Sequence, residues 1–360
     1  MSNFQYFPLV KTRDSELRCF AKLPDGVKDK VLPIYELTKS RKTKKVPDGD
    51  IYRRMETIAE IQGDRPFILD LTMDDRYINP QIRQLLSPQH GFSEWRYFVF
   101  ENFSYLNIIP MLHVVEEEES GFPELRDFVA YASQKKDHVA IRIPYDLTTE
   151  EFDTYLGPIK ESLSESCKIF VILDAEYVRE DAEHNLGGLV NTFAESCVEV
   201  ERVFHPDQIE KISMLCSSFP TSPAQAGGED AEGEFSVYEE EIYQSIKCSY
   251  PNIGYGDYAS INTEQVEIRG ATFVPRIDIF QDDGKSFIYK RYRQKDGGYP
   301  KCARRVKEDS EKYSEISNCW ACEEIDLASS GTASGLSPSF WISVRMNYYI
   351  RKIMRLRLIS

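Results

Sequence analysis

Short apolar runs rich in β-branched residues alternate with helical stretches along most of this chain, and this alternation limits the available folds more than any other feature. Strands that are apolar along their whole length are typical of a parallel sheet covered by helices on both faces. The expected strands are 6–10, 31–37, 66–71, 107–114, 139–143, 167–173, 212–218 and 258–261. The expected helices between them are 15–23, 51–62, 93–103, 122–133, 149–164, 181–198 and 235–246.

This α/β pattern favours a closed (β/α)8 TIM-like barrel, because single strand-plus-helix units of roughly 30 residues recur about eight times. An open doubly wound sheet is the alternative fold. We expect the barrel to span residues 1–270. Two basic or Gly-rich segments inside it, 38–50 and 221–234, are predicted to be mobile loops.

The pattern changes after residue 270, which predicts a C-terminal appendage over 271–360 packed on the barrel. Segments 272–279 and 286–292 alternate in polarity around Asp282-Asp283-Gly284, which indicates a hairpin. A charged helix is predicted over 299–313, a Ser/Gly loop over 329–339 and a terminal helix over 340–358. The terminal helix carries several Arg and Lys residues, and we expect it to lie on the acidic barrel.

The charge balance excludes some classes of function. The net charge is −15, from 59 acidic and 44 basic residues, so non-specific binding to nucleic acid is disfavoured. No apolar run is long enough to span a membrane, and the N-terminus lacks the features of a signal peptide. The widely spread cysteines are expected to be free thiols in a reducing compartment, so we expect a cytoplasmic protein.

Polar residues follow every predicted strand, and this is the strongest indication of a site. Because the C-terminal ends of barrel strands open at a common mouth, their side chains are expected to converge there. The expected ligand-binding residues are Lys11, Glu36, Asp70, Arg142, Asp174, Ser218 and Asp257, with His113 beside them. The alternative is that these charges only pair with one another and stabilise the barrel.

Each residue type in this set suits a chemical role. Lys11 and Arg142 are suited to an anionic ligand or transition state, and His113 or Asp257 to proton transfer. The carboxylates of Glu36, Asp70 and Asp174 are the hard oxygen ligands that Mg²⁺ or another divalent cation prefers.

Other motifs are less specific. Cys319 and Cys322 have the spacing of half a zinc site, but no second pair follows, and buried thiols explain them better. Gly254–Asp257 is interpreted as a turn that places Asp257. The basic run 39–45 is interpreted as a solvated loop, although it is suited to a phosphate backbone or an acidic partner.

Several motifs, in order along the chain, together resemble the beta-protein family, which occurs in phages and bacteria. They are Tyr6–Lys11 (YFPLVK) followed by Glu16, Leu32–Leu37 (LPIYEL), Ser217–Pro220 (SSFP), Gly256–Ala259 (GDYA), Cys319-Trp320 and the segment around Trp341. The resemblance implies a barrel-like fold and a phage or anti-phage context, and it supplies no reaction. The family tends to place an arginine before the helix near Tyr238, where this chain has Phe235–Tyr238 (FSVY).

Two functions follow from these observations. The first is a component of a phage–host conflict system, in anti-phage defence or phage counter-defence. It would bind an anionic small molecule, or a protein partner encoded nearby or by phage, through the charged mouth. The alternative is a metal-dependent phosphoric-ester hydrolase, a phosphodiesterase or nuclease-like enzyme, that uses the same residues. The sequence leaves open whether the protein is an enzyme.

Overall fold

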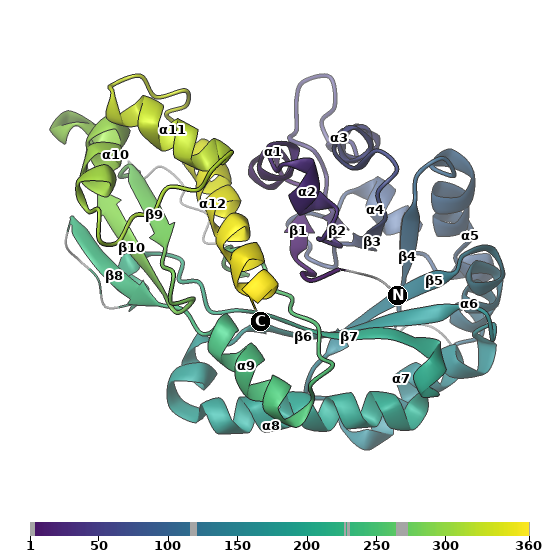
Figure 1. Cartoon of the computed structure of the whole chain (residues 1–360). Helices are drawn as coiled ribbons and strands as arrows, with labels where there is room; N and C mark the ends of the chain where they lie inside the picture. Colours follow the sequence, from purple (N-terminus) through teal and green to yellow (C-terminus); the bar gives the residue numbers. More distant parts are fainter. Residues whose placement is uncertain (1–3, 116–120, 227, 229–230, 264–272, 360) are drawn as a thin grey trace.

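The computed structural model describes residues 4–115, 121–226, 228, 231–263 and 273–359 (Figure 1). Seven parallel strands, hydrogen-bonded in the order in which they occur in the chain, form a nearly closed barrel. They are β1 (Leu9–Lys11), β2 (Ile34–Leu37), β3 (Phe67–Leu71), β4 (Ile108–Leu112), β5 (His138–Pro144), β6 (Lys168–Tyr177) and β7 (Ile209–Ser217). The mixed α/β barrel predicted from the alternation is confirmed at this level, and the open sheet is not what forms.

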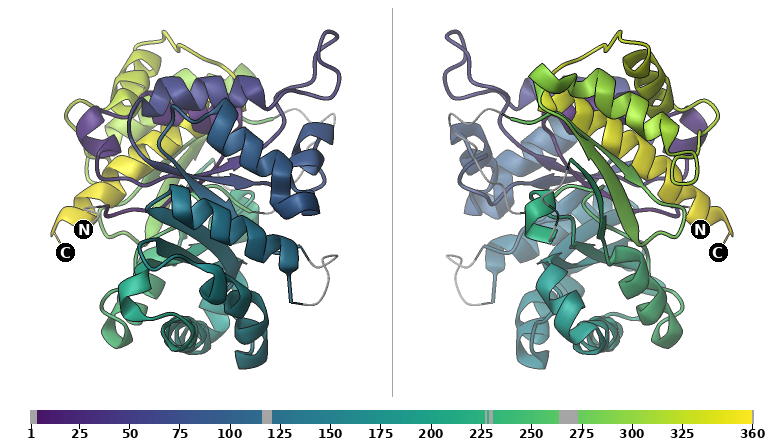
Figure 2. Two further views of the ribbon diagram at one scale, coloured as in Figure 1. Left: turned by 90° about the vertical axis from the view of Figure 1, so that its right-hand side faces the viewer. Right: turned by 90° about the vertical axis from the view of Figure 1, so that its left-hand side faces the viewer.

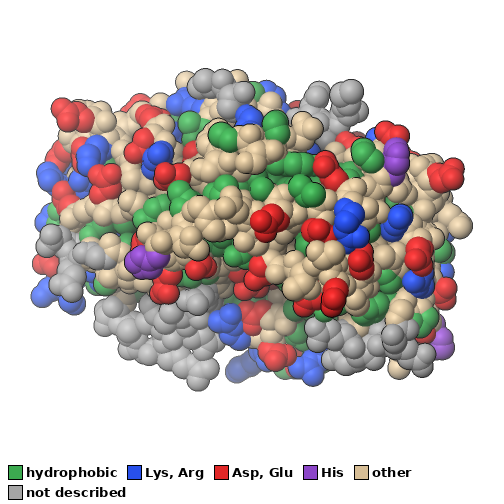
Figure 3. Space-filling view, turned by 90° about the horizontal axis from the view of Figure 1, so that it is seen from below, with side chains coloured by type: hydrophobic (Ala, Val, Ile, Leu, Met, Phe, Trp, Pro, Cys, Tyr) green, Lys and Arg blue, Asp and Glu red, His purple; other side chains and the backbone are tan. Residues whose placement is uncertain are grey.

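Helices follow the strands and cover the outside of the barrel (Figures 1 and 2). They are α1 (Asp14–Ala21), α2 (Asp25–Lys28), α3 (Tyr52–Gln62), α4 (Pro80–Leu85), α5 (Gln89–Tyr97), α6 (Pro123–Lys135), α7 (Thr149–Ser162), α8 (Arg179–Val203) and α9 (Glu239–Ser249). The start of α7 is fixed by a capping box, in which the Thr148 side chain accepts from the Glu151 amide and Glu151 accepts from the Thr148 amide. Acidic, basic and apolar side chains are interspersed on the face seen from below (Figure 3).

The predicted eighth strand at 258–261 does not form. Instead, residues 254–257 fill the gap between β7 and β1 through isolated parallel bridges, Ser213 with Gly254 and Cys216 with Asp257. On the other side, the amides of Phe7 and Leu9 donate to the carbonyls of Tyr255 and Asp257, each at 2.9 Å. A Cβ at Gly256 would lie 2.5 Å from the Met214 carbonyl oxygen, so only glycine allows both neighbouring backbones to approach.

Side chains alternate between two apolar cores along each strand, as the period of two requires. The outward set packs under the helices. The inward set fills the barrel and consists of Phe7, Leu9, Leu32, Ile34, Ile68, Ile109, Met111, Ala140, Phe170, Ile172, Leu215 and Tyr258. This alternation also decides which residues face inward at the strand ends.

The C-terminal part is a three-stranded antiparallel sheet with three helices beside it (Figure 1). Its elements are β8 (Glu232–Ser236), β9 (Arg276–Phe280), β10 (Ser286–Arg291), α10 (Gly298–Glu308), α11 (Trp320–Ser329) and α12 (Pro338–Ile359). The hairpin, the charged helix and the terminal helix are confirmed, with α10 ending earlier than expected, whereas α11 was not predicted.

The segment 221–234 was predicted to be a mobile loop, and for its described C-terminal end this is wrong. Strand β8 begins at Glu232 and pairs along its length with β10, and the helix expected from Phe235 begins only at Glu239. The charge of Glu232 is compatible with this strand because Glu232 forms ion pairs with Lys290 and Arg305. The division at residue 270 stays a prediction, but it leaves β8 on the barrel side although β8 pairs within the C-terminal sheet.

Helix α12 connects the C-terminal part to the barrel seam, which is the segment 254–257 between β7 and β1. It packs on α1 and β9, and the Tyr349 hydroxyl donates to Asp257 Oδ2 at 2.6 Å. Asp257 also accepts from the hydroxyls of Tyr6 and Tyr255 and from the Ala259 amide. Because Asp257 lies in the segment that closes the barrel, one buried carboxylate ties the seam to the terminal helix.

Tyr349→Phe is expected to lower the free energy of unfolding by about 1.5–3 kcal/mol, because it removes a donor to a buried carboxylate and leaves the ring in place. Chemical denaturation followed by circular dichroism measures this. Tyr97→Phe, which changes an exposed tyrosine, is the matched control and should have little effect. Equal stabilities of the two variants would show that this hydrogen bond does not fasten α12.

Candidate functional site

Six of the predicted site residues converge at the mouth of the barrel. Lys11, Glu36 and Asp70 are register partners on β1, β2 and β3. Each lies two residues beyond an inward-facing apolar residue, Leu9, Ile34 and Ile68, so its side chain also faces inward. The same spacing places His113 after Met111, Arg142 after Ala140 and Asp174 after Ile172.

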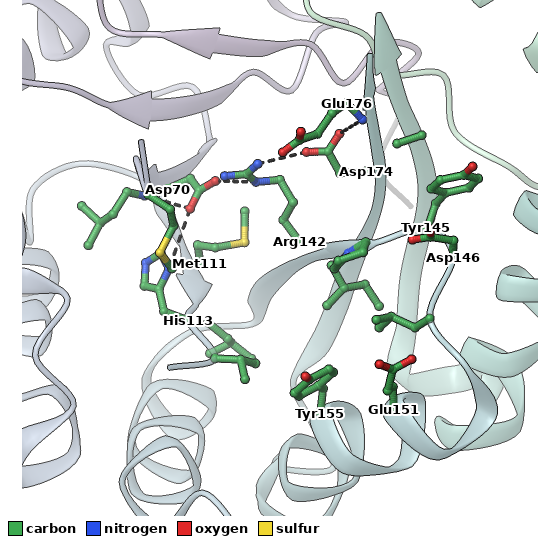
Figure 4. Close-up of a pocket in the computed structure, with 18 residues that line it drawn as sticks. Asp70, Met111, His113, Arg142, Tyr145, Asp146, Glu151, Tyr155, Asp174 and Glu176 are labelled. Carbon is green, nitrogen blue, oxygen red and sulfur yellow. Dashed lines mark hydrogen bonds and ion pairs between the residues drawn. The ribbon is translucent and has the colours of Figure 1, made fainter. Parts of the chain in front are cut away.

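The Arg142 guanidinium lies at the centre of this group and contacts three carboxylates, of which Asp70 and Asp174 are drawn in Figure 4. Its Nε donates to Asp70 Oδ2 at 2.8 Å, its Nη1 to Asp174 Oδ2 at 3.0 Å and its Nη2 to Glu36 Oε2 at 3.3 Å. Lys11 Nζ lies 3.6 Å from Glu36 Oε1. The Arg142 side chain is only 18% exposed, so its charge is largely withdrawn from water and needs these partners.

Burial and pairing oppose each other in this cluster. Burial alone would lower the pKa of Arg142, but Asp70, Glu36 and Asp174 raise it well above its ordinary value. Burial raises the pKa of Asp70, while Arg142 and the Leu71 amide pull it down. Each charge in the cluster therefore depends on the presence of its partners.

Tyr258 is a member of this cluster that the sequence analysis did not identify. Its hydroxyl donates to Asp174, at 2.7 and 2.8 Å from the two carboxylate oxygens. It was missed because the sequence analysis assigned the polar position of the eighth unit to Asp257, the residue directly before the expected strand at 258–261. Tyr258 faces inward and Asp257 outward, because the two are adjacent in an extended segment.

His113 is buried next to this cluster, with its ring edge-on to Trp95 at 5.6 Å between centroids. Its Nδ1 lies 3.8 Å from Asp70 Oδ1, which is too long for a hydrogen bond, and its buried Nε2 has no partner among the described residues. Burial, with a smaller contribution from Arg142, lowers the pKa of His113 to about 3. The imidazole is therefore neutral near pH 7.

Two adjoining cavities, of about 680 and 740 Å³, open at the mouth and share Arg142 and Glu176 in their walls. Their walls hold three basic side chains, Lys11, Arg76 and Arg142. The acidic side chains in the same walls are Glu36, Asp70, Asp74, Asp146, Glu151, Asp174, Glu176, Glu180 and Asp181. The mouth therefore has a clear surplus of negative charge.

Glu176 lies where the two cavities meet and was not identified from the sequence. It lies within an irregularity of the β6–β7 pairing, between Asp174 and Tyr177, and has φ of +50°, a region that L-residues rarely adopt. Its amide donates to Asp174 Oδ1 at 2.9 Å, which holds this turn (Figure 4). Burial and the nearby Asp174 raise the pKa of its carboxyl group. No periodicity in the sequence signals such a turn.

Ser218 and Asp257, the other two predicted ligand-binding residues, are not brought to the mouth. Ser218 is one residue past the inward-facing Ser217, so it faces outward, and its hydroxyl donates to Glu239 at 2.8 Å. Asp257 is enclosed by the three tyrosines described above. Both residues form buried hydrogen bonds to helices outside the barrel, Ser218 to Glu239 of α9 and Asp257 to Tyr349 of α12.

The stretch before α9, where the family tends to have an arginine, is contacted by an arginine from elsewhere. Arg179 of α8 donates to the carbonyl oxygens of Ser236 and Ser218, at 2.6 and 2.9 Å. Its guanidinium also lies 5.7 Å from the centre of the Tyr238 ring. A guanidinium is therefore present beside this stretch although the sequence lacks one within it.

The carboxylates proposed as metal ligands do not form a metal site. Glu36, Asp70 and Asp174 surround Arg142, so a guanidinium stands where the hypothesis placed a divalent cation. Over the described ranges, no group of three or more His, Cys, Asp and Glu residues is arranged to hold a metal ion. The donor set therefore does not fit Mg²⁺ in this arrangement. Within the same ranges, no helix has the length and apolar character to cross a membrane.

Comparisons with known proteins identify similar chains. Residues 6–355 match the sequence model of a family described as "Beta protein". "Protein beta" of Enterobacteria phage P4 is 29% identical over 359 residues, which cover 98% of this chain and 94% of the phage protein. Among solved structures, the Bacillus cereus spore cortex-lytic enzyme SleL aligns with 96% of this chain and 74% of its own, with 6% identity and a TM-score of 0.26. That structural likeness is too weak to support an argument.

Arg142→Ala is expected to lower the free energy of unfolding by about 3–5 kcal/mol, because three carboxylates lose their shared partner. The loss should shrink as the pH falls, because protonation of Asp70, whose pKa is already raised, relieves the repulsion. Denaturation at several pH values measures both effects. Arg126→Ala, which breaks the exposed pair with Glu161, is the control, with an expected change below about 1 kcal/mol. Equal losses in the two variants would contradict a central role for Arg142.

His113 should make stability fall with acidification. Its folded pKa is about 3 and its unfolded pKa about 6.5, so between these values the unfolded chain binds one more proton than the folded protein. The stability advantage of wild type over His113→Phe should therefore decrease by about 1.4 kcal/mol for each pH unit from 6.5 towards 3. Parallel denaturation curves at pH 7, 6, 5 and 4 measure this, and a difference independent of pH would show that the imidazole is not held neutral.

Proposed function

Because this chain belongs to the Beta protein family, we propose that it is a binding component of a phage–host conflict system. The family resemblance seen in the sequence motifs is confirmed by the match over residues 6–355. The relative in phage P4 supports the phage context. All eight cysteines are free, which supports action in a reducing compartment such as the cytoplasm.

The excess of carboxylates at the mouth indicates which charge a ligand should carry. The three guanidinium nitrogens of Arg142 are already engaged by Asp70, Asp174 and Glu36, and Lys11 also lies beside Glu36. An anionic ligand would have to displace these carboxylates and approach the remaining ones. A cationic group meets no such opposition, so we infer that the mouth receives the Lys or Arg side chain of a protein partner.

The residues suited to such a group lie at the rim of the mouth. Glu176 lies near the end of β6, Glu180 and Asp181 lie in the first turn of α8, and all three line the cavity of about 740 Å³. Among the described residues, neither Glu180 nor Asp181 forms an ion pair with a Lys or Arg, whereas the charges of Arg142 and Lys11 act on Glu176 without outweighing burial and the charge of Asp174. Rim carboxylates that are not neutralised would attract and orient a basic side chain.

The hydrolase hypothesis is not carried further. It depends on a divalent cation held by Glu36, Asp70 and Asp174, and those carboxylates instead pair with Arg142. The predicted proton-transfer residues do not support it either, because Asp257 is enclosed outside the mouth and the buried His113 has a pKa of about 3.

Binding of a fluorescein-labelled tetralysine peptide, measured by fluorescence anisotropy, tests the proposed ligand chemistry. The combined variant Glu176→Gln and Glu180→Gln should bind about tenfold more weakly than wild type, because two rim charges are removed without loss of volume. The control is Glu56→Gln with Glu60→Gln, which removes the same charge from exposed positions on α3. Equal weakening in both variants, or no binding by wild type, would refute a basic ligand at the mouth.

The phage context is tested separately in host cells that express the complete chain together with its neighbouring genes. Wild type is expected to change the efficiency of plating of at least one phage in a panel, and the Glu176/Glu180 variant to lose that effect. If the variant keeps the full effect while its peptide binding is lost, the mouth does not mediate the phage phenotype.

A further inference from the structure

A separate hollow, of about 600 Å³, lies beside the mouth and has the opposite charge. Six basic side chains line it, namely Arg13, Lys39, Arg41, Lys42, Arg54 and Arg76. The only carboxylate in its wall is Asp14. In a chain with a net charge of −15, this concentration of positive charge is not a consequence of composition.

Only half of these charges are neutralised by carboxylates. Arg54 pairs with Asp14 at 2.6 Å, Arg76 with Asp74 at 2.6 Å, and Arg13 with Glu16. Lys39 instead donates to the Ile78 carbonyl at 3.0 Å, and the exposed Arg41 and Lys42 have no side-chain partner among the described residues. Three cations therefore remain available at one hollow.

The loop that presents these cations was interpreted from the sequence as mobile and solvated, but its base is held by specific contacts. The Lys39 amide donates to the Tyr77 carbonyl at 3.1 Å, and the Asp50 amide donates to Ser40 Oγ at 2.9 Å. Gly49 has φ of +76°, and a Cβ there would lie 2.4 Å from the Ser40 carbonyl oxygen. The loop extends away from the body of the protein (Figure 2), and Lys39, Arg41 and Lys42 near its start line the same hollow as Asp14 at the start of α1.

Two helices begin at the wall of the hollow. Helix α1 starts at Asp14, and its N-cap residue Arg13 makes no side-chain capping hydrogen bond. Helix α12 starts at Pro338, and Ser339 in its first turn also lines the hollow. Helix N-termini present amide groups and partial positive charge, so both favour an anion at this position. Tyr77 adds an aromatic ring, contacted by Arg13 at 5.8 Å from its centre.

We propose that this hollow binds the phosphoryl group of a small phosphorylated ligand of about nucleotide size. Three unpaired cations and two helix N-termini match the multiple charge and the oxygen acceptors of a phosphate better than a single carboxylate. The volume suits a small ligand, whereas the negative charge of the protein as a whole repels an extended polyanion. This site takes the anionic chemistry that the sequence analysis assigned to the barrel mouth, and it is independent of the ligand proposed there.

Isothermal titration of the full chain with sodium pyrophosphate, and in separate arms with AMP and ATP, tests this proposal. Wild type is expected to bind pyrophosphate, and the combined variant Arg41→Ala and Lys42→Ala to bind it about tenfold more weakly. Both substituted residues are exposed, so the fold should be retained, which circular dichroism verifies. Tighter binding of a nucleotide than of pyrophosphate would identify a nucleotide site, and equal or weaker binding would identify a site for the phosphoryl group alone.

The control is Lys44→Ala with Lys45→Ala, which removes the same charge from the same loop at positions that do not line the hollow. Retained pyrophosphate affinity in this variant supports a built site. Equal weakening in both variants would show diffuse attraction by the loop and overturn the proposal, as would the absence of binding by wild type. Tighter binding of a single-stranded oligonucleotide that depends equally on Lys44 and Lys45 would also overturn it.

Discussion

The ion cluster around Arg142 determines how the mouth of this barrel is built. One guanidinium faces carboxylates from β2, β3 and β6, so side chains from distant parts of the sequence must meet within hydrogen-bond distance. The charges stand directly above the apolar filling of the barrel, where water does not screen them fully. If one partner is removed, the others are left buried with their charge uncompensated, so the barrel and its mouth depend on the same contacts.

This dependence also decides what the mouth can bind. Because Arg142 pairs with three carboxylates, its positive charge is neutralised within the protein. The rim of the mouth carries three further acidic residues, Glu176, Glu180 and Asp181. The basic hollow nearby has the reverse arrangement, with cations left over after each carboxylate has been paired. The two sites lie on the same side of the protein and share Arg76 in their walls, so a partner carrying both a basic side chain and a phosphoryl group would have a surface for each.

The terminal helix has a comparable role on the outside of the barrel. The segment at 254–257 closes the gap between β7 and β1 with few hydrogen bonds of its own, so its attachment to α12 through Asp257 and Tyr349 strengthens the weakest point of the ring. Among the basic residues of α12, Arg357 pairs with Glu240 of α9, whereas Arg345 pairs with Asp278 of β9, within the C-terminal part, at 3.0 Å. The C-terminal part is thus joined to the barrel at its seam.

The residue pattern was sufficient to predict the seven barrel strands, most of the helices and six of the residues at the mouth. It did so because local hydrophobic pattern fixes these elements, and the period of two along a strand fixes which side chains face inward. Three features depend on tertiary contacts: Arg142 lies among the three carboxylates proposed as metal ligands, Tyr258 and not Asp257 faces the mouth, and Glu176 has a positive φ. These features depend on which side chains, distant in sequence, come into contact, and on the position of the irregular segment at 254–257. The local hydrophobic pattern specifies neither.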